Sequence, residues 1–184
     1  MKLHLGRRSL LVSSLFVLIF LACNTTPAPP EANPADVGSM DAIIAAVYDT
    51  ISGPAGTKRN WDRFRSLFVP GARLISNGRR KEDESSWRVL TVDEYIGRSG
   101  SLLEEKGFFE KEVARRTEAF GSIAQAFSSY ESRYHAEDPI PIQRGINSFQ
   151  LINDGKRWWV VTVSWQNEDA KNRIPERYLQ KSDP

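Results

Sequence analysis

The sequence predicts an α+β domain in which three N-terminal helices pack on one face of a strongly curved antiparallel sheet. The helices are indicated by apolar residues at helical spacing between positions 39 and 106, bounded by capping residues and by Gly-Pro or Pro-Gly stops. The sheet is indicated by alternating segments after Gly107, among which Asn153-Asp154-Gly155 is typical of a hairpin turn.

Each of the three helices has a recognisable start. The first is expected to begin near Ser39, whose hydroxyl can cap the first turn, and to stop before Gly53-Pro54. The second should follow Asn60 and end at Pro70-Gly71. The third opens with Thr91-Val92-Asp93-Glu94, which has the form of a capping box, and runs to about residue 106.

The strands fall into two groups. Two short strands, 72–76 and 87–90, are predicted on either side of a charged loop over 77–86, and four longer strands follow over 108–120, 123–135, 144–152 and 157–167. In the last strand Trp159, Val161, Val163 and Trp165 share one parity, so one face of the sheet should be apolar and covered by the helices. The alternation leaves open which parity faces inward, and one β-bulge would reverse it.

The first 22 residues have the composition of a secretory signal. Lys2, Arg7 and Arg8 precede an apolar run of about a dozen residues, which is short for a bilayer span of roughly twenty. The stretch Phe20-Leu21-Ala22-Cys23 resembles the lipobox of bacterial lipoproteins, with Phe20 in place of the usual aliphatic residue. The resemblance implies a lipid on Cys23, the only cysteine; the alternative is an ordinary signal with an incidental cysteine.

This interpretation sets the expected organisation and address of the chain. We expect a signal peptide over 1–22, a Pro/Ala-rich tether over 23–38, one domain over 39–168 and a polar tail over 169–184. The lipid would anchor the protein in the bacterial cell envelope. Asn24 after the cysteine, by resemblance to enterobacterial lipoproteins, favours the periplasmic face of the outer membrane.

The charge of the mature chain argues against nucleic-acid binding. The whole sequence has 25 basic and 23 acidic residues, but Lys2, Arg7 and Arg8 leave with the signal, so the mature part has 22 basic residues against 23 acidic ones. A near-neutral domain lacks the broad basic surface that nucleic-acid binding requires.

Several stretches resemble the nuclear transport factor 2-like superfamily, also called SnoaL-like. They are the residues 67–74 after the second helix, Phe120-Gly121-Ser122-Ile123-Ala124 at a strand junction, and the residues 144–151 leading through Asp154-Gly155 to Trp158-Trp159. The resemblance covers about 39–168 and implies a cone-shaped roll whose concave face encloses a pocket. Members include isomerases, dehydratases, hydrolases, cyclases and proteins without known catalysis, so the fold alone selects no function.

Metal and nucleophilic chemistry find little support. His135 is the only histidine left after the signal is removed, so a site with several imidazole ligands is excluded and no metal site or cofactor is predicted. His135 could serve as the base for a serine, but it lies where a strand enters a polar loop, and an exposed histidine explains it better.

Acid–base chemistry would need a carboxylate inside the pocket, where burial raises its pKa. Asp62 and Asp93 lie in first turns of helices, where capping explains them, while Glu118 and Glu131 lie on strands and could face either way. No catalytic residue is assigned from these.

Aromatic and polar residues could instead line a binding cavity, although large aromatics are first of all core material. Only one of Arg115 and Arg116 can face the cone, because neighbouring strand residues point to opposite faces. The candidate ligand-binding residues are Tyr48, Trp87, Tyr95, Arg116, Tyr130, Asn147 and Trp159.

Two functions follow from these observations. The first is a non-catalytic module that binds a small apolar or acidic molecule, or a protein. The second is a cofactor-independent isomerase, dehydratase or hydrolase that uses a buried carboxylate. The polar convex face of the sheet also suits a homodimer, since it carries small side chains such as Ser148, Thr162 and Ser164.

Overall fold

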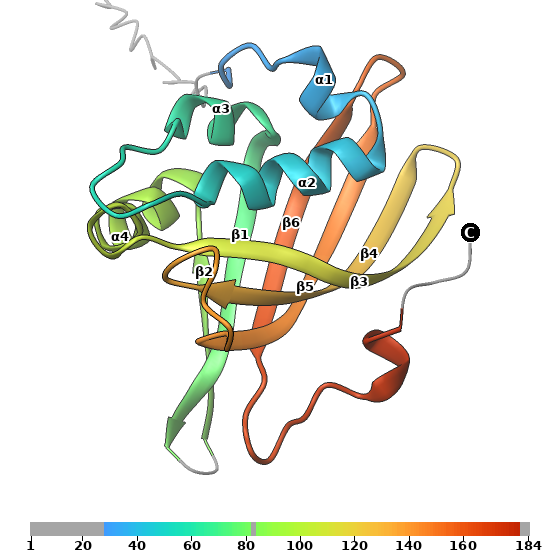
Figure 1. Ribbon diagram of the computed structural model, residues 1–184. Coiled ribbons are helices and arrows are strands. Elements are labelled where there is room, and N and C mark those ends of the chain that lie inside the picture. The colour runs from blue at the N-terminus through green and yellow to red at the C-terminus, as the bar shows by residue number, and fades with distance from the viewer. Residues whose placement is uncertain (1–27, 82–83, 181–184) are drawn as a thin grey trace, which may run out of the picture.

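The computed structural model describes residues 28–81 and 84–180, so the predicted signal and Cys23 lie outside the described residues. Within those ranges, no helix is long and apolar enough to cross a membrane. The elements, drawn in Figure 1, are α1 (Pro34–Val37), α2 (Met40–Ile51), α3 (Trp61–Ser66), β1 (Phe68–Lys81), β2 (Glu84–Leu90), α4 (Val92–Lys106), β3 (Phe109–Phe120), β4 (Ile123–Arg133), β5 (Gln143–Asn153), β6 (Trp158–Asn167) and the 3-10 turn η1 (Glu176–Tyr178).

The strands form one mixed sheet in the order β2-β1-β6-β5-β4-β3. Neighbouring strands are antiparallel except β1 and β6, which run parallel, with Phe68 opposite Val160 and Leu74 opposite Val163. The parallel pair differs from the fully antiparallel sheet that was expected. Between β1 and β6 the chain passes through β2, α4, β3, β4 and β5, and β6 then lies beside β1 in the same direction. The α+β class and the order of elements are confirmed.

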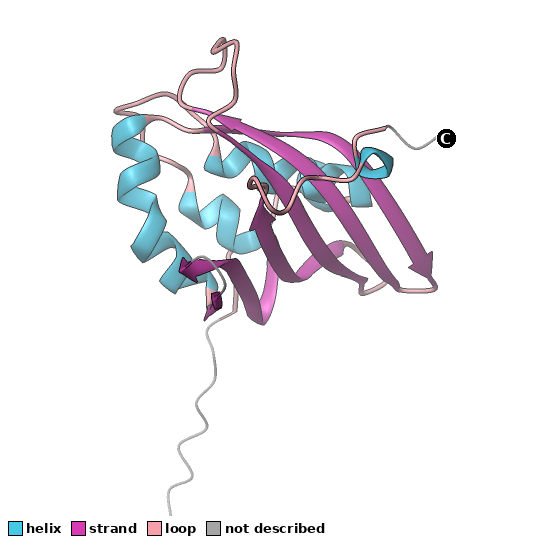
Figure 2. Ribbon diagram, turned by 90° about the horizontal axis from the view of Figure 1, so that it is seen from below, coloured by secondary structure: helices cyan, strands magenta, loops and turns pink. Residues whose placement is uncertain are grey.

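The helices cover the concave face of the sheet. Figure 1 shows α2 lying across the strands with α3 and α4 beside it, and Figure 2 shows the long strands bending around this layer. The core lies between the two layers, where several large apolar side chains are almost completely buried: Ile43, Ile44, Phe64, Leu67, Phe68, Phe149 and Val160. The burial of this one cluster holds the helices on the sheet.

The three predicted helix starts are confirmed. The hydroxyl of Ser39 accepts from the Ala42 amide at 3.1 Å, and the side chain of Asn60 accepts from the Arg63 amide at 2.9 Å. Thr91 and Glu94 form the reciprocal capping box at the start of α4.

A short helix, α1, lies inside the range predicted as tether. Pro34 occupies the start of α1, where a missing amide hydrogen costs nothing, and Asn33 caps the turn by accepting from the Ala35 amide. Asp36 in this turn forms a two-pronged ion pair with Arg63 of α3, at 2.7 and 2.9 Å. This contact, together with the burial of Val37 in the core, attaches α1 to the domain.

The charged stretch 77–86 is not the loop that its composition indicated. β1 continues to Lys81 and β2 begins at Glu84, with Asn77 opposite Trp87 and Gly78 opposite Ser86. The prediction of a loop here is wrong. Charged residues indicate that a segment faces solvent, but they do not exclude that its backbone pairs as a β-hairpin.

Two β-bulges change which side chains face the helices. In β6, Gln150 lies opposite Thr162 but Leu151 lies opposite Val160, so Val161 is the extra residue. In β3, Glu112 lies opposite Tyr130 but Ala114 lies opposite Ser129, so Val113 is the extra one. Residues on either side of each bulge therefore follow opposite parities.

Candidate active site between the helices and the sheet

A cavity of about 210 Å³, here called the inner cavity, lies between the helices and the concave face of the sheet. Leu102 of α4 and Gln143 of β5 line it and are exposed, so the cavity reaches the surface between these two elements. Most of the lining is apolar, and it contains no lysine or arginine among the described residues. The polar lining residues are Tyr95, Ser99, Glu110, Tyr130, Gln143, Asn147 and Asn167.

Glu110 is the one carboxylate on this lining. It lies two residues into β3, and the bulge at Val113 leaves it on the concave face with its cross-strand neighbour Ser132. The Asn147 amide donates to its Oε1 at 3.2 Å. Burial raises the pKa of Glu110 to about 7, and the Asn147 hydrogen bond offsets only part of that rise.

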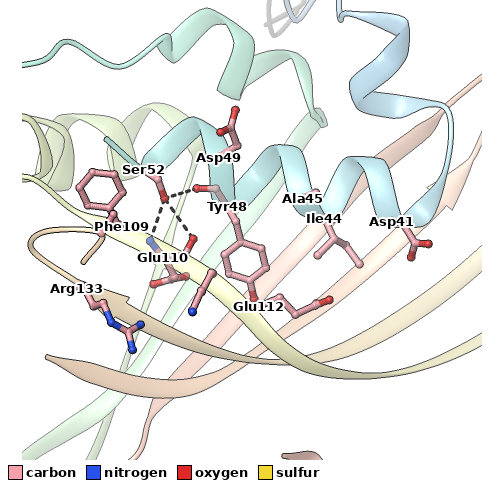
Figure 3. A pocket seen from close by; sticks show the side chains of 12 residues that line it. Asp41, Ile44, Ala45, Tyr48, Asp49, Ser52, Phe109, Glu110, Glu112 and Arg133 are labelled. Carbon is pink, nitrogen blue, oxygen red and sulfur yellow. Dashed lines mark hydrogen bonds between the residues drawn. The ribbon is translucent and has the colours of Figure 1, made fainter. Parts of the chain in front are cut away.

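A second hollow of about 400 Å³, here called the outer cleft, lies between α2 and the first half of β3. Figure 3 shows Tyr48 reaching from α2 toward β3, where it lies beside Glu112. Ser52 ties the end of α2 to β3, since its hydroxyl accepts from the Glu110 amide at 3.0 Å and donates to the Tyr48 carbonyl at 2.7 Å. Glu110 lines both hollows.

Hydrogen bonds connect the two glutamates of β3. Asn147 donates to Glu110 and, at 3.1 Å, to the hydroxyl of Tyr48. The Tyr48 and Ser128 hydroxyls are 2.7 Å apart, and Ser128 donates to Glu112. Burial raises the pKa of Glu112 as well, against the lowering effects of Ser128 and Arg115.

Three tyrosines surround Glu110. Burial is the main cause that raises the pKa of Tyr48, Tyr95 and Tyr130, and the negative charge of Glu110 raises each further. Tyr130 donates to the Asn167 side chain at 2.6 Å. The Tyr95 ring packs against Phe64, and none of the described residues hydrogen-bonds to its hydroxyl.

Four of the predicted ligand-binding residues thus meet at one place. Tyr48, Tyr95, Tyr130 and Asn147 come from four different elements and surround Glu110. Their placement on the concave face agrees with the sequence prediction, and their role in binding stays a prediction.

The other three predicted residues lie elsewhere. Trp87 is 71% exposed on the edge strand β2. Arg116 follows the bulge of β3 and faces the convex side, where its Nε donates to the Arg177 carbonyl. Trp159 precedes the bulge of β6 and faces away from the core, donating to Asp154 with the Arg157 guanidinium 3.6 Å above its ring. Their assignment to the pocket is corrected.

The four carboxylates weighed from the sequence all have structural partners. Asp62 and Asp93 pair with Arg65, Glu118 accepts from Gln125, and Glu131 pairs with Arg133. Sequence reasoning missed Glu110 and Glu112. Glu110 and Glu112 are two positions apart in a strand, which indicates that they face the same side of the sheet. The bulge at Val113 reverses the alternation after them, so the later residues of the strand do not show which side that is.

No protein-family model matches the sequence, and no curated protein matches it. Among solved structures, a Nostoc punctiforme protein of unknown function with a cystatin-like fold is 9% identical, with a TM-score of 0.54 over 71% of this chain and 90% of that one. An uncharacterised Caulobacter vibrioides protein with a cystatin-like fold is 12% identical, with a TM-score of 0.54 over 73% and 90%. A putative dehydratase of the nuclear transport factor 2-like family from Streptomyces avermitilis reaches a TM-score of 0.49, at 15% identity, over 73% and 97%.

The likenesses to the Nostoc and Caulobacter proteins show the fold and not the activity. The chain is an α+β protein with a cystatin-like fold.

Proposed function

We propose that the domain is a cofactor-independent enzyme that binds a small neutral molecule in the inner cavity and uses Glu110 as its general base. The observation that carries this proposal is a buried carboxylate, with one hydrogen-bond donor and a pKa of about 7, on an apolar cavity. A base whose pKa is close to the working pH is both ionised and basic enough to accept a proton.

The size and lining of the cavity support an apolar class of substrate. Its volume of about 210 Å³ is somewhat larger than the cavity of roughly 150 Å³ that encloses a benzene ring. An anion would meet Glu110 without a lysine or arginine on the described lining to balance it. Of the apolar and acidic ligands predicted from the sequence, the apolar class is therefore the one we propose.

The reaction is a proton transfer. The Glu110 carboxylate removes a proton from a carbon next to a carbonyl group, the carbon–hydrogen bond breaks, and its electron pair moves onto the carbonyl oxygen. Tyr95, whose hydroxyl is uncommitted among the described residues, can donate to that oxygen. Return of the proton from Glu110 to another carbon completes an isomerisation. Alternatively, a hydroxyl group on the next carbon takes this proton and leaves as water while the electron pair returns from the oxygen to form a carbon–carbon double bond, which completes a dehydration.

Binding without conversion is the alternative function. It is favoured by the fact that two of the three tyrosine hydroxyls are already engaged, Tyr48 with Ser128 and Tyr130 with Asn167. Such a module would hold the same class of ligand and leave it unchanged.

The probe 5-nitrobenzisoxazole separates these functions, because a base that removes its ring proton opens the ring to a coloured nitrophenolate. We expect the wild type to open the ring, at a rate that rises with pH through about 7 as Glu110 ionises. Glu110→Gln should lower the rate by roughly a hundredfold or more.

The matched control is Glu118→Gln, which removes a carboxylate bonded to Gln125 away from the cavity and should keep the wild-type rate. An equal rate in wild type and Glu110→Gln would refute the general base. Saturable binding of the probe, measured by calorimetry, without ring opening would support the binding module instead.

We further propose that a lipid on Cys23 anchors the protein in the bacterial cell envelope, on the periplasmic face of the outer membrane. The basis is the lipobox-like sequence ending in the only cysteine. In bacteria fed a labelled fatty acid, the chain should take up label and sediment with outer membranes, and Cys23→Ser should do neither. Labelling that survives Cys23→Ser would contradict the assignment.

A further inference from the structure

The hydrogen bonds between Glu110 and Glu112 form a chain in which Asn147 donates to both sides and the hydroxyls donate toward Glu112. Asn147 Nδ2 has two hydrogens, one donated to Glu110 and one to the Tyr48 oxygen. The Tyr48 hydrogen is then available to Ser128, and the Ser128 hydrogen goes to Glu112. An ionised carboxylate can only accept, so an ionised Glu112 requires Ser128 to donate to it and Tyr48 to donate to Ser128, which leaves the Tyr48 oxygen to accept from Asn147.

The opposite direction has a definite consequence at the far end. If Ser128 donated to Tyr48, the Tyr48 hydrogen would point at Asn147, whose side-chain amide would have to rotate and present Oδ1. That oxygen beside Glu110 can only accept, so Glu110 would have to be protonated to donate to it. The direction of the chain and the proton on Glu110 are therefore coupled.

We propose that Glu112 is a positioning residue, whose carboxylate oxygen fixes the direction of this chain so that Asn147 presents its N–H to Glu110. The proposal concerns the site of the proposed function and assigns Glu112 no contact with the substrate. Its effect is to keep Glu110 in the ionised form that a general base needs.

The groups around the two ends suit these different roles. Among the described residues, the groups that face Glu110 on the inner cavity are neutral hydroxyl and amide groups, from Tyr48 on α2, Tyr95 on α4, Tyr130 on β4 and Asn147 on β5. On its other side Glu110 reaches the outer cleft, which Arg133 of β4 also lines. Glu112 has a cation beside it, with Arg115 Nε 3.6 Å from its Oε1.

The remaining charged groups near Glu112 lie on α2 and around the outer cleft. Asp41 opposes the ionisation of Glu112 and also pairs with Arg115. Asp49, Lys111 and Arg133 also line the cleft, and Asp49 pairs with Arg63. Burial raises the pKa of Glu112, and Ser128 and Arg115 oppose that rise, so these two neighbours favour a negative charge at this end of the chain.

Two substitutions at Glu112 separate its acceptor oxygen from its charge. Glu112→Met removes both, so the chain can reverse, and the measured pKa of Glu110 should rise by about one pH unit. Glu112→Gln removes the charge but keeps an oxygen that accepts from Ser128. Because loss of a nearby negative charge favours ionisation, Glu112→Gln should lower the pKa of Glu110.

The measurement is a carbon-13 NMR titration of protein labelled at the glutamate carboxyls, with the Glu110 signal assigned by its loss in Glu110→Gln. The proposal would be overturned if Glu112→Met lowered the pKa of Glu110, or if both variants changed this pKa equally. Loss of the Glu112 charge alone would explain either result. Glu118→Gln serves as the control for loss of a distant carboxylate and should leave the titration unchanged.

Ser128→Ala is a second test that changes no charge and fits a fully buried site. It removes the acceptor of Tyr48, so the pKa of Glu110 should again rise, whereas charge effects alone predict no change. An unchanged pKa in a variant with a cooperative melting transition would overturn the proposal. The titration needs no substrate, so its failure is distinct from failure of the proposed activity, which would appear as absent ring opening by the wild type.

Discussion

At the scale of the residue, Glu110 lowers the stability of the domain whenever it is ionised. Its ordinary pKa of 4.5 rises to about 7 on folding, so between these values the folded state holds more protons than the unfolded state. Stability contributed by the neutral carboxyl is full below the ordinary pKa and is lost as the pH rises through about 7. An ionisable group that lies on a cavity lining and lowers the stability of the fold is typical of a functional site.

This cost gives a prediction that needs no ligand. Relative to wild type, Glu110→Gln should gain about 3 kcal/mol in free energy of unfolding between pH 4.5 and pH 8, since each unit of pKa difference corresponds to about 1.4 kcal/mol. Urea unfolding of both proteins at the two pH values measures it. A difference that does not change with pH would mean that the carboxyl is solvated in the folded state.

Gly145 shows how a single residue shapes the site. A Cβ at this position would lie 2.5 Å from the Tyr130 hydroxyl and 2.4 Å from the Gln166 carbonyl oxygen. Only glycine therefore lets Tyr130 lie against β5 and reach Asn167. The sequence places Gly145 in a recognisable motif, but the reason for the glycine becomes evident only from the cross-strand contact.

At the scale of the element, the sequence predicts what local chemistry decides. Ser39, Asn60 and Thr91 begin their helices where expected, because a cap is a contact between residues two or three positions apart. The hairpin at Asp154-Gly155 also needs only local information, since the Asp154 side chain accepts from the amides of Lys156 and Arg157.

The same local information fails at the bulges. Val113 and Val161 become extra residues through pairing with β4 and β5, which are distant partners that no local pattern reports. Trp159 was expected on the face of Trp165, and the bulge between them places it on the other face. For the same reason the sequence indicates only part of the candidate site. Tyr48, Tyr95, Tyr130 and Asn147 lie around Glu110, their role in binding stays a prediction, and Glu110 itself was overlooked.

The connection between α2 and α3 depends on a contact that is likewise not readable from sequence. Arg59 is 8% exposed and donates to carbonyl oxygens of Ile51, Gly53 and Thr57, and also of Leu103 in α4. These bonds satisfy the end of α2 and hold α4 beside it. The inner cavity lies between these helices and the sheet, so its shape depends on this arginine.

At the scale of the whole molecule, the curvature of the sheet creates the inner cavity on the concave face, whereas the C-terminal segment of the chain contacts the convex face. On the convex face the chain after β6 folds back over the sheet (Figure 2). The Tyr178 ring packs on Phe127 with centroids 5.0 Å apart, and Ser129 donates to the Tyr178 carbonyl at 2.6 Å. The segment predicted as a polar tail thus covers part of the surface proposed for a homodimer.

The C-terminal segment therefore sets the condition for that dimer. We expect purified residues 24–184 to sediment as a monomer, and Tyr178→Ala to shift part of the protein to a dimer, because it uncovers Phe127 and weakens the contact over Ser129. Tyr134→Ala, which removes the ring of another exposed tyrosine just after β4, is the matched control. A Tyr178→Ala protein that stays monomeric in analytical ultracentrifugation at concentrations of about 100 μM would argue against the convex face as a dimer interface, since even a weak specific interface has a Kd near that range.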